Sequence, residues 1–199
     1  MIKAILFDID GVLSASGPRF FGKALEKDHG ISNEKAITFF HGVFRKVLKG
    51  ELDLKTEIGP YLKDWGWRGT VQDFLDYWFK SEHKSSEKLI KFIQKLRKQG
   101  ILCCLATNQE NYRAKYILKE MGFEKAFDKY YFSAHIGHKK PEIKFFEKVF
   151  KDLKIFRKDE ILFWDDLGRN IIAAREFGFI AEQYTTFEDS KKKMKKYLA

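Results

Sequence analysis

The sequence has little of what marks secreted and membrane proteins. Only two cysteines occur among 199 residues, and they are neighbours, Cys103 and Cys104. Neighbours on a strand point to opposite faces of a sheet, so we expect no disulfide and no shared metal, and interpret both as buried small hydrophobic residues. No apolar run approaches the length of a membrane span. Met1 leads into a strand-like run without the apolar segment of a secretion signal. We therefore expect a cytoplasmic protein with no membrane partner.

The charge pattern lacks the marks of a nucleic-acid-binding protein. The formal net charge is +10, but the lysines are spread along the whole chain, and the one dense basic run is KKKMKK at 191–196. We recognise no nucleic-acid-binding motif. The five histidines show no spacing typical of metal ligands. We interpret the charge as a lysine-rich surface that attracts small anions, and we expect no nucleic-acid partner.

Apolar residues are plentiful enough for a packed core. Hydrophobic residues make up 44% of the chain and charged residues 33%, which excludes wholesale disorder. A length of 199 residues suits one domain, or one domain with a modest insertion.

A helical pattern, a glycine and a strand-like run follow one another three times. The helical patterns at 85–99, 111–121 and 168–177 each end in glycine, and strand-like runs follow at 101–106, 130–134 and 179–184. A further helix is predicted to start at Pro141 and to precede the run EILFWDD at 160–166. The strand-like runs are continuously apolar, as in a parallel sheet covered on both faces. We predict an α/β protein with a Rossmann-like parallel sheet of about five strands flanked by helices.

Residues 15–84 interrupt this alternation. No convincing strand lies between Leu13 and Ile101, and the segments 34–50 and 70–83 both look helical, the first with an apolar face that runs from Phe40 to Leu48. We predict an all-helical insertion over 15–84, and a core domain made of 1–14 and 85–199. The many aromatic residues of the insertion are interpreted as its core rather than as a platform for substrate.

Polar residues follow four of the predicted strands, where each strand ends. They are Asp8 and Asp10, then Thr107 and Asn108, then Lys140, and finally Asp165 and Asp166. In open parallel α/β sheets these ends lie on one side, where ligands bind, so we expect the seven side chains to converge.

The chemistry of this set indicates a metal and a phosphate. Four carboxylates in one pocket cannot all stay ionised without compensation, and Mg²⁺ supplies it while favouring carboxylates, waters and phosphate oxygens. Thr107, Asn108 and Lys140 offer hydroxyl, amide and ammonium donors that suit phosphate oxygens. The set therefore predicts a metal-assisted phosphoryl-transfer site with a carboxylate as candidate nucleophile.

At these residues the chain resembles the haloacid dehalogenase superfamily. DIDGVL at 8–13, LATN at 105–108, KKPE at 139–142 and WDDLGRN at 164–170 match its four motifs in order and spacing. The resemblance covers residues 5 to about 183, and the insertion is similar to the small helical (C1) cap of the class I members. The resemblance implies a hydrolase with a Rossmann-like core and a helical cap.

The resemblance also implies roles for the four aspartates. Asp8 is similar to the nucleophile that forms an aspartyl-phosphate, and Asp10 to the general acid and base. Asp8, the main-chain carbonyl of Asp10 and Asp166 are expected to hold Mg²⁺. Asp165 is expected to be either a further ligand or a support for the others.

The remaining motif residues are implied to bind phosphate or to shape the site. Thr107 and Asn108 are expected to bind the transferring phosphoryl group, and Lys140 to neutralise charge on the nucleophile and the phosphate. Gly11 is expected to allow the sharp turn after Asp10, and Asn170 to orient the fourth motif.

The resemblance favours a Mg²⁺-dependent phosphatase of a small phosphorylated metabolite, such as a sugar phosphate. A phosphomutase of the same family is the alternative. A haloacid dehalogenase is disfavoured because those enzymes lack the acid at the position of Asp10, and a non-catalytic basic binding protein because the motifs are intact. The insertion is expected to be a mobile lid, hinged near Ser14–Gly17 and Glu82–Ser86, that sets substrate choice. The sequence leaves the substrate and the choice between monomer and dimer open.

Overall fold

Five parallel strands form one sheet in the part of the chain that the computed structural model describes, residues 1–14, 18–154 and 157–198. They are β1 (Ala4–Phe7), β2 (Leu102–Thr107), β3 (Lys129–Phe132), β4 (Ile161–Asp165) and β5 (Ile180–Gln183), in the order β3-β2-β1-β4-β5. β1 therefore lies at the centre, paired with β2 on one side and β4 on the other. The predicted Rossmann-like sheet is confirmed.

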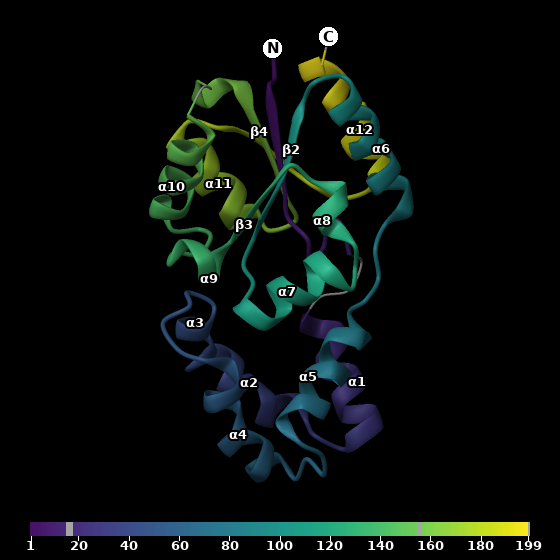
Figure 1. Cartoon of the computed structure of the whole chain (residues 1–199), viewed down its shortest axis with the longest axis vertical. Helices are drawn as coiled ribbons and strands as arrows, with labels where there is room; N and C mark the ends of the chain where they lie inside the picture. Colours follow the sequence, from purple (N-terminus) through teal and green to yellow (C-terminus); the bar gives the residue numbers. More distant parts are fainter. Residues whose placement is uncertain (15–17, 155–156, 199) are drawn as a thin grey trace.

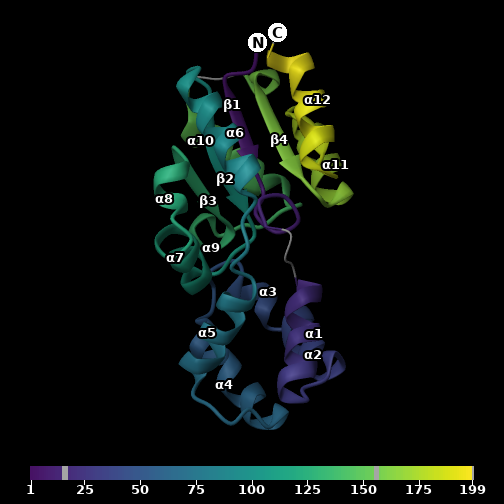
Figure 2. The same ribbon diagram turned by 90° about the vertical axis from the view of Figure 1, so that its right-hand side faces the viewer.

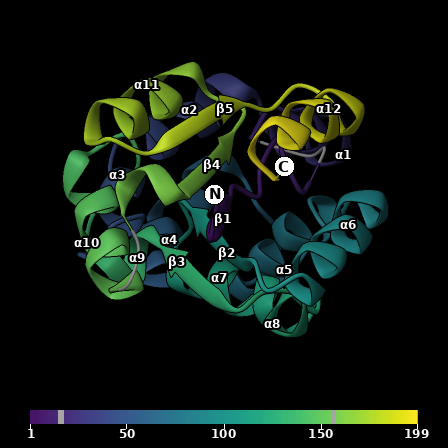
Figure 3. The same ribbon diagram turned by 90° about the horizontal axis from the view of Figure 1, so that it is seen from above.

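Helices cover both faces of this sheet, as the view from above shows (Figure 3). One face is packed by α6 (Glu87–Lys98), α7 (Asn111–Lys119), α8 (Phe123–Ala126) and α12 (Phe187–Leu198), and the other by α10 (Ile143–Leu153) and α11 (Gly168–Phe177). The short α9 (Ser133–Ile136) follows β3, and the 3-10 helix η1 (Lys158–Glu160) precedes β4. Cys103 belongs to the first apolar layer and Cys104 to the second, and both are buried and free, as predicted.

A group of helices lies beyond the carboxyl ends of the strands (Figures 1 and 2). We call it the helical insert: α1 (Pro18–His29), α2 (Asn33–His41), α3 (Phe44–Val47), α4 (Leu54–Trp65) and α5 (Val71–Ser81). It has an apolar cluster of its own, in which Phe39, Phe74 and Trp78 are buried and Trp78 stacks on Phe21 at 5.2 Å between ring centroids. These aromatic residues are core, as interpreted from the sequence.

The helical insert contacts the α/β unit along α7. The hydroxyl of Tyr112 donates to Asp53 Oδ2 at 2.6 Å, and Arg113 Nη1 donates to the Phe79 carbonyl at 2.9 Å. His83 and Tyr116 are joined by a hydrogen bond of 2.8 Å. Part of the first predicted hinge, residues 15–17, lies outside the described residues.

Two helices depart from the sequence-based prediction. The helical face expected from Phe40 to Leu48 is interrupted, because Gly42 leaves the helical region (φ −97°, ψ −113°) and separates α2 from α3. The helix expected at Pro141 begins two residues later, at Ile143, because Glu142 is extended (ψ 127°). Within the described ranges, every helix is too short or too polar to traverse a bilayer.

Candidate active site

Three of the predicted groups meet directly at the carboxyl edge of the sheet, around a buried lysine. Lys140 is 1% exposed, and its Nζ lies 2.9 Å from Asp8 Oδ1 and 2.5 Å from Asp165 Oδ2. Burial lowers the pKa of the Lys140 ammonium, but the carboxylates of Asp165 and Asp8 outweigh it, so the net pKa is raised. Lys140 therefore stays charged and binds the ends of β1 and β4 together.

Asp8 ends the central strand in a buried position. Its main-chain N–H donates to the Trp164 carbonyl at 2.9 Å, which continues the pairing of β1 with β4, and the Ile9 N–H donates to Asp8 Oδ1 at 2.8 Å. Burial raises the pKa of Asp8 to about 8; Lys140 opposes this shift, and the charges of Asp165 and Asp10 add to it. An ionised Asp8 thus needs more positive charge than Lys140 supplies.

The neighbours Asp165 and Asp166 have different surroundings. Both oxygens of Asp165 accept hydrogen bonds: Asn170 Nδ2 donates to each at 2.9 Å, the Leu167 N–H donates to Oδ1 at 2.9 Å, and Lys140 reaches Oδ2. Asp166 is half-buried, and burial followed by repulsion from Asp165 raises its pKa. Asp165 is held by protein donors, whereas Asp166 is the more open of the two carboxylates.

The carboxylates of Asp8, Asp165 and Asp166 fit a divalent cation. Each offers an oxygen, and the three oxygens lie within 4.8 Å of one another. Burial and mutual repulsion raise the pKa of Asp8 and of Asp166, and a hard cation with oxygen ligands would relieve both effects. The residues present therefore suit Mg²⁺.

The turn after Asp10 is packed against this cluster. Gly11 has φ +82°, and its N–H donates to the Ser14 carbonyl at 2.8 Å, while the Ser14 N–H donates to the Ile9 carbonyl at 2.8 Å. A Cβ on Gly11 would lie 2.4 Å from both Cγ and Oδ2 of Asp166. The turn expected from the sequence is present, and the glycine also makes room for Asp166.

Thr107 and Asn108 differ in what their side chains contact. Thr107 Oγ1 is buried and has no hydrogen-bond partner among the described residues, so it is open to a ligand. The amide of Asn108 instead pairs with the main chain of Lys140: Nδ2 donates to the carbonyl at 2.9 Å, and the N–H donates to Oδ1 at 2.8 Å. The Asn108 amide therefore holds the Lys140 loop, and phosphate binding by Asn108 stays a prediction.

The site contains residues that the sequence did not single out. Gln109 Nε2 donates to Asp10 Oδ2 at 2.7 Å. Burial raises the pKa of Asp10, and the nearby guanidinium of Arg113 acts against that shift. Arg113 is 2% exposed and lies 3.4 Å (Nη2 to Oε2) from Glu82, whose pKa burial raises to about 7. Arg113 lies four positions before the apolar Ile117, so the two residues share one face of a helix. That spacing was the sequence signal that could have revealed a buried Arg113.

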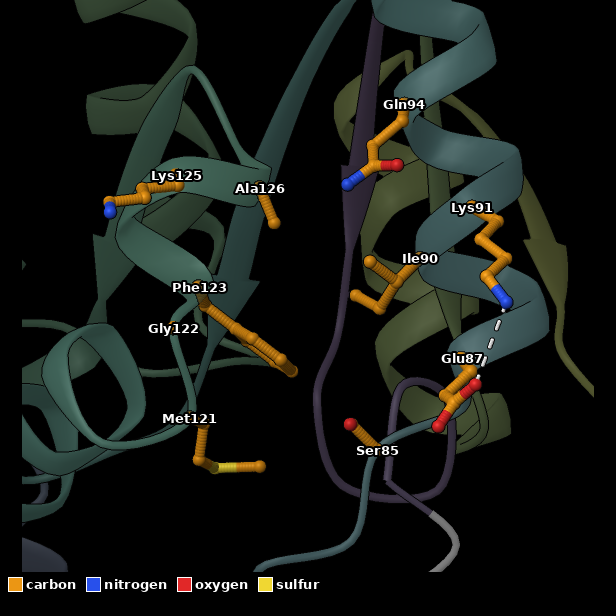
Figure 4. Close-up of a pocket in the computed structure, with 10 residues that line it drawn as sticks. All are labelled: Ser85, Glu87, Ile90, Lys91, Gln94, Met121, Gly122, Phe123, Lys125 and Ala126. Atoms are coloured by element: carbon orange, nitrogen blue, oxygen red, sulfur yellow. Dashed lines mark ion pairs between the residues drawn. The ribbon is translucent and has the colours of Figure 1, made fainter.

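Two surface cavities lie outside this carboxylate cluster. A groove of about 300 Å³ between α6 and α8 has Ile90, Met121 and Phe123 on its walls, with the ion pair Lys91–Glu87 (3.6 Å) at one side (Figure 4). A second cavity of about 410 Å³ borders Gly11, Lys84 and Tyr184. The second cavity therefore reaches the turn that packs against Asp166, and the first does not.

Comparison with known proteins gives matches in sequence and in fold. A sequence model of the haloacid dehalogenase-like hydrolases matches residues 2–178. A predicted HAD-like family hydrolase from Porphyromonas gingivalis superposes with a TM-score of 0.83 at 22% identity, covering 100% of this chain and 98% of its own. A HAD family enzyme from Bacteroides thetaiotaomicron, in complex with magnesium and inorganic phosphate, superposes with a TM-score of 0.81 at 23% identity. The match covers 95% of this chain and 97% of that enzyme. L-2-haloacid dehalogenase from Xanthobacter autotrophicus superposes with a TM-score of 0.67 at 16% identity, and the match covers 98% of this chain and 82% of the dehalogenase.

Proposed function

Because the chain belongs to the haloacid dehalogenase-like hydrolases, we propose that it is a Mg²⁺-dependent phosphatase of a small phosphorylated metabolite, such as a sugar phosphate. The observation that carries this proposal is the buried Asp8 at the end of the central strand, held 2.9 Å from the Lys140 ammonium within a cluster of three carboxylates. That arrangement suits a carboxylate nucleophile that attacks phosphorus and forms an aspartyl-phosphate.

Asp8 and Asp166 would hold Mg²⁺, together with the main-chain carbonyl of Asp10. Asp165 supports them by anchoring Lys140, since both of its oxygens already accept protein donors. When bound, Mg²⁺ would supply positive charge that offsets the charge of the phosphoryl oxygens. The magnesium and phosphate complex of the Bacteroides thetaiotaomicron enzyme, which shares this fold, supports the proposal.

Protein donors would bind the phosphoryl group from two further sides. The buried Thr107 hydroxyl, unpartnered within the described part of the chain, is available to a phosphoryl oxygen. The Lys140 ammonium neutralises charge on Asp8 and on the phosphate. Asn108 would contribute its main-chain N–H, because its side chain holds the Lys140 loop.

The reaction would proceed in two displacements. An oxygen of Asp8 attacks phosphorus, the bond from phosphorus to the leaving oxygen breaks, and Asp10 gives a proton to that oxygen. Asp10 then accepts a proton from a water molecule, whose oxygen attacks the phosphorus and releases the Asp8 carboxylate. The side chain of Asp10 supports hydrolysis of phosphate esters over dehalogenation, which needs no proton for its leaving halide.

We assign substrate choice to the helical insert. It lies beyond the carboxyl ends of the strands, on the side of the nucleophile (Figure 2), and a lid at that place would exclude bulk water during the reaction. A cytoplasmic location remains a prediction from the sequence.

A screen of phosphorylated metabolites with the purified protein tests the proposal. We expect phosphate release with Mg²⁺ and loss of release in EDTA. Transfer of the phosphoryl group within the substrate, without free phosphate, would instead favour a phosphomutase. Failure of every ester in a broad panel, or undiminished release in EDTA, would contradict the proposal.

A further inference from the structure

The two carboxylate oxygens of Asp10 have different surroundings. Oδ2 accepts a hydrogen bond from Gln109 Nε2 at 2.7 Å. Oδ1 is buried, and no described residue forms a hydrogen bond with it. The main chain of the turn is fixed by the hydrogen bond of 2.8 Å from the Gly11 N–H to the Ser14 carbonyl. One oxygen of Asp10 is thus tied to a neighbour while the other is open to a ligand.

The main chain of Gln109 is itself held by hydrogen bonds. Gln109 is 6% exposed, and its main-chain carbonyl accepts hydrogen bonds from Ser133 Oγ and from the Ala134 N–H, both at 3.2 Å. Both donors belong to the start of α9, which follows the edge strand β3. The Gln109 side chain therefore links a loop anchored at the sheet edge to Asp10, at the turn after the central strand.

Arg113 does not replace Gln109 in this contact. Its guanidinium donates to the main-chain carbonyls of Phe79 (2.9 Å) and Glu82 (3.5 Å) and pairs with the Glu82 carboxylate at 3.4 Å. Arg113 therefore acts on Asp10 through its charge, whereas Gln109 constrains the direction of the carboxylate.

We propose that Gln109 is a positioning residue for proton transfer: by holding Oδ2 it stops the Asp10 carboxylate from rotating about its Cβ–Cγ bond and reserves Oδ1 for the leaving group. This inference rests on the proposed phosphatase activity. When the bond from phosphorus to the leaving oxygen breaks, its electron pair stays on that oxygen, and the proton on Oδ1 joins it. Without Gln109 the carboxylate turns, and the proton is misplaced when it is needed.

The nature of the leaving group separates this role from a structural one. An alkoxide is a strong base and needs a proton as it departs, whereas p-nitrophenolate is a weak base and leaves without one. Both esters form the same aspartyl-phosphate, so breakdown of that intermediate cannot produce a difference between them. A merely misfolded or loosened site would lose activity on both esters alike.

The test compares kcat/KM of Gln109→Met on p-nitrophenyl phosphate and on the best alkyl phosphate of the substrate screen. Methionine keeps the length of glutamine without the donor, and Gln109→Ala serves as the second variant if methionine prevents folding. We expect a loss of about a hundredfold on the alkyl ester, at the lower end of what general acid–base catalysis contributes. On p-nitrophenyl phosphate we expect little change. Gln94→Met, at an exposed glutamine of α6, is the matched control and should equal the wild type on both esters.

Two results would overturn the inference in distinguishable ways. Equal losses of Gln109→Met on both esters, or no loss on the alkyl ester, would remove Gln109 from proton transfer while leaving the phosphatase activity intact. A wild-type protein without Mg²⁺-dependent phosphate release from either ester would overturn the proposed function and this inference with it.

Discussion

Gly11→Ala should weaken the metal site through a contact that can be isolated by a matched control. Gly11 has φ +82°, and a methyl group there would lie 2.4 Å from Cγ and Oδ2 of Asp166 and 2.9 Å from its Cβ. Two costs follow. An L-residue in the left-handed region costs about 1–2 kcal/mol, and the new methyl group must also displace Asp166.

Gly100→Ala carries the first cost without the second. Gly100 has nearly the same conformation, φ +83°, and a Cβ there would meet nothing within 4 Å. We expect this variant to lose about 1–2 kcal/mol of unfolding free energy, or about 2–8 °C in Tm for a chain of this size, and to keep its activity. Any further effect of Gly11→Ala then reports on Asp166.

The size of that further effect follows from the overlap. To restore ordinary van der Waals contact at about 3.4 Å, the Asp166 carboxylate must move by about 1 Å, and a displacement of that size in a catalytic site costs about a hundredfold in rate. We expect kcat/KM of Gly11→Ala to fall about a hundredfold and its half-saturating Mg²⁺ concentration to rise. Urea unfolding, phosphate release and Mg²⁺ titration of the wild type and both variants measure the three quantities. Similar activity and Mg²⁺ dependence in the two variants would refute the assignment of Asp166 to the metal.

Three further outcomes are expected. Asp8→Asn should fold at least as stably as the wild type, because burial already raises the pKa of Asp8 to about 8, and should lose turnover; wild-type turnover would exclude Asp8 as nucleophile. Lys140→Met should cost about 3–5 kcal/mol in urea unfolding, because it leaves the buried Asp8 and Asp165 without their cation; unchanged stability would contradict this pairing. Burial raises the pKa of Glu110 in the folded protein from 4.5 to about 7. Between these two pH values the unfolded chain has lost the Glu110 proton while the folded protein keeps it, so the free energy of unfolding falls as the pH rises from 4.5 to 7. The free energy of unfolding of Glu110→Gln should fall less steeply from pH 4.5 to 7 than that of the wild type. Equal slopes in the two proteins would argue against a buried, neutral Glu110.

The sheet and the convergence of the motif residues could be predicted because both follow from local patterns. Apolar runs such as ILCCLA mark buried strands whatever surrounds them. Parallel strands then bring their carboxyl ends to one edge, so Asp8, Asp165 and Asp166 had to lie near one another once the order of strands was right.

The pairing of particular side chains could not be predicted, because it depends on distances between loops. The sequence predicts Asn108 as a phosphate ligand, but no sequence pattern predicts that its amide pairs with the main-chain N–H and carbonyl of Lys140. Gln109 belongs to the same loop and reaches Asp10, which is distant in sequence, only after β1 and β2 are paired. Arg113 is buried against α5 because the insert packs on α7, a tertiary contact without a sequence pattern of its own.

The central place of β1 has a consequence for the order in which the protein is made. Ala4 pairs with Leu102 and with Ile161, so the strand that carries Asp8 leaves the ribosome long before either neighbour has been synthesised. The helical insert, with an apolar cluster of its own, comes out in between. Pairing β1 with β2 and β4 closes long loops of the chain, so the sheet forms more slowly than the local contacts within the helices. A nascent chain that ends before Ile161 still lacks Asp165 and Asp166, so the carboxylate cluster around Asp8 is complete only after β4 has been synthesised.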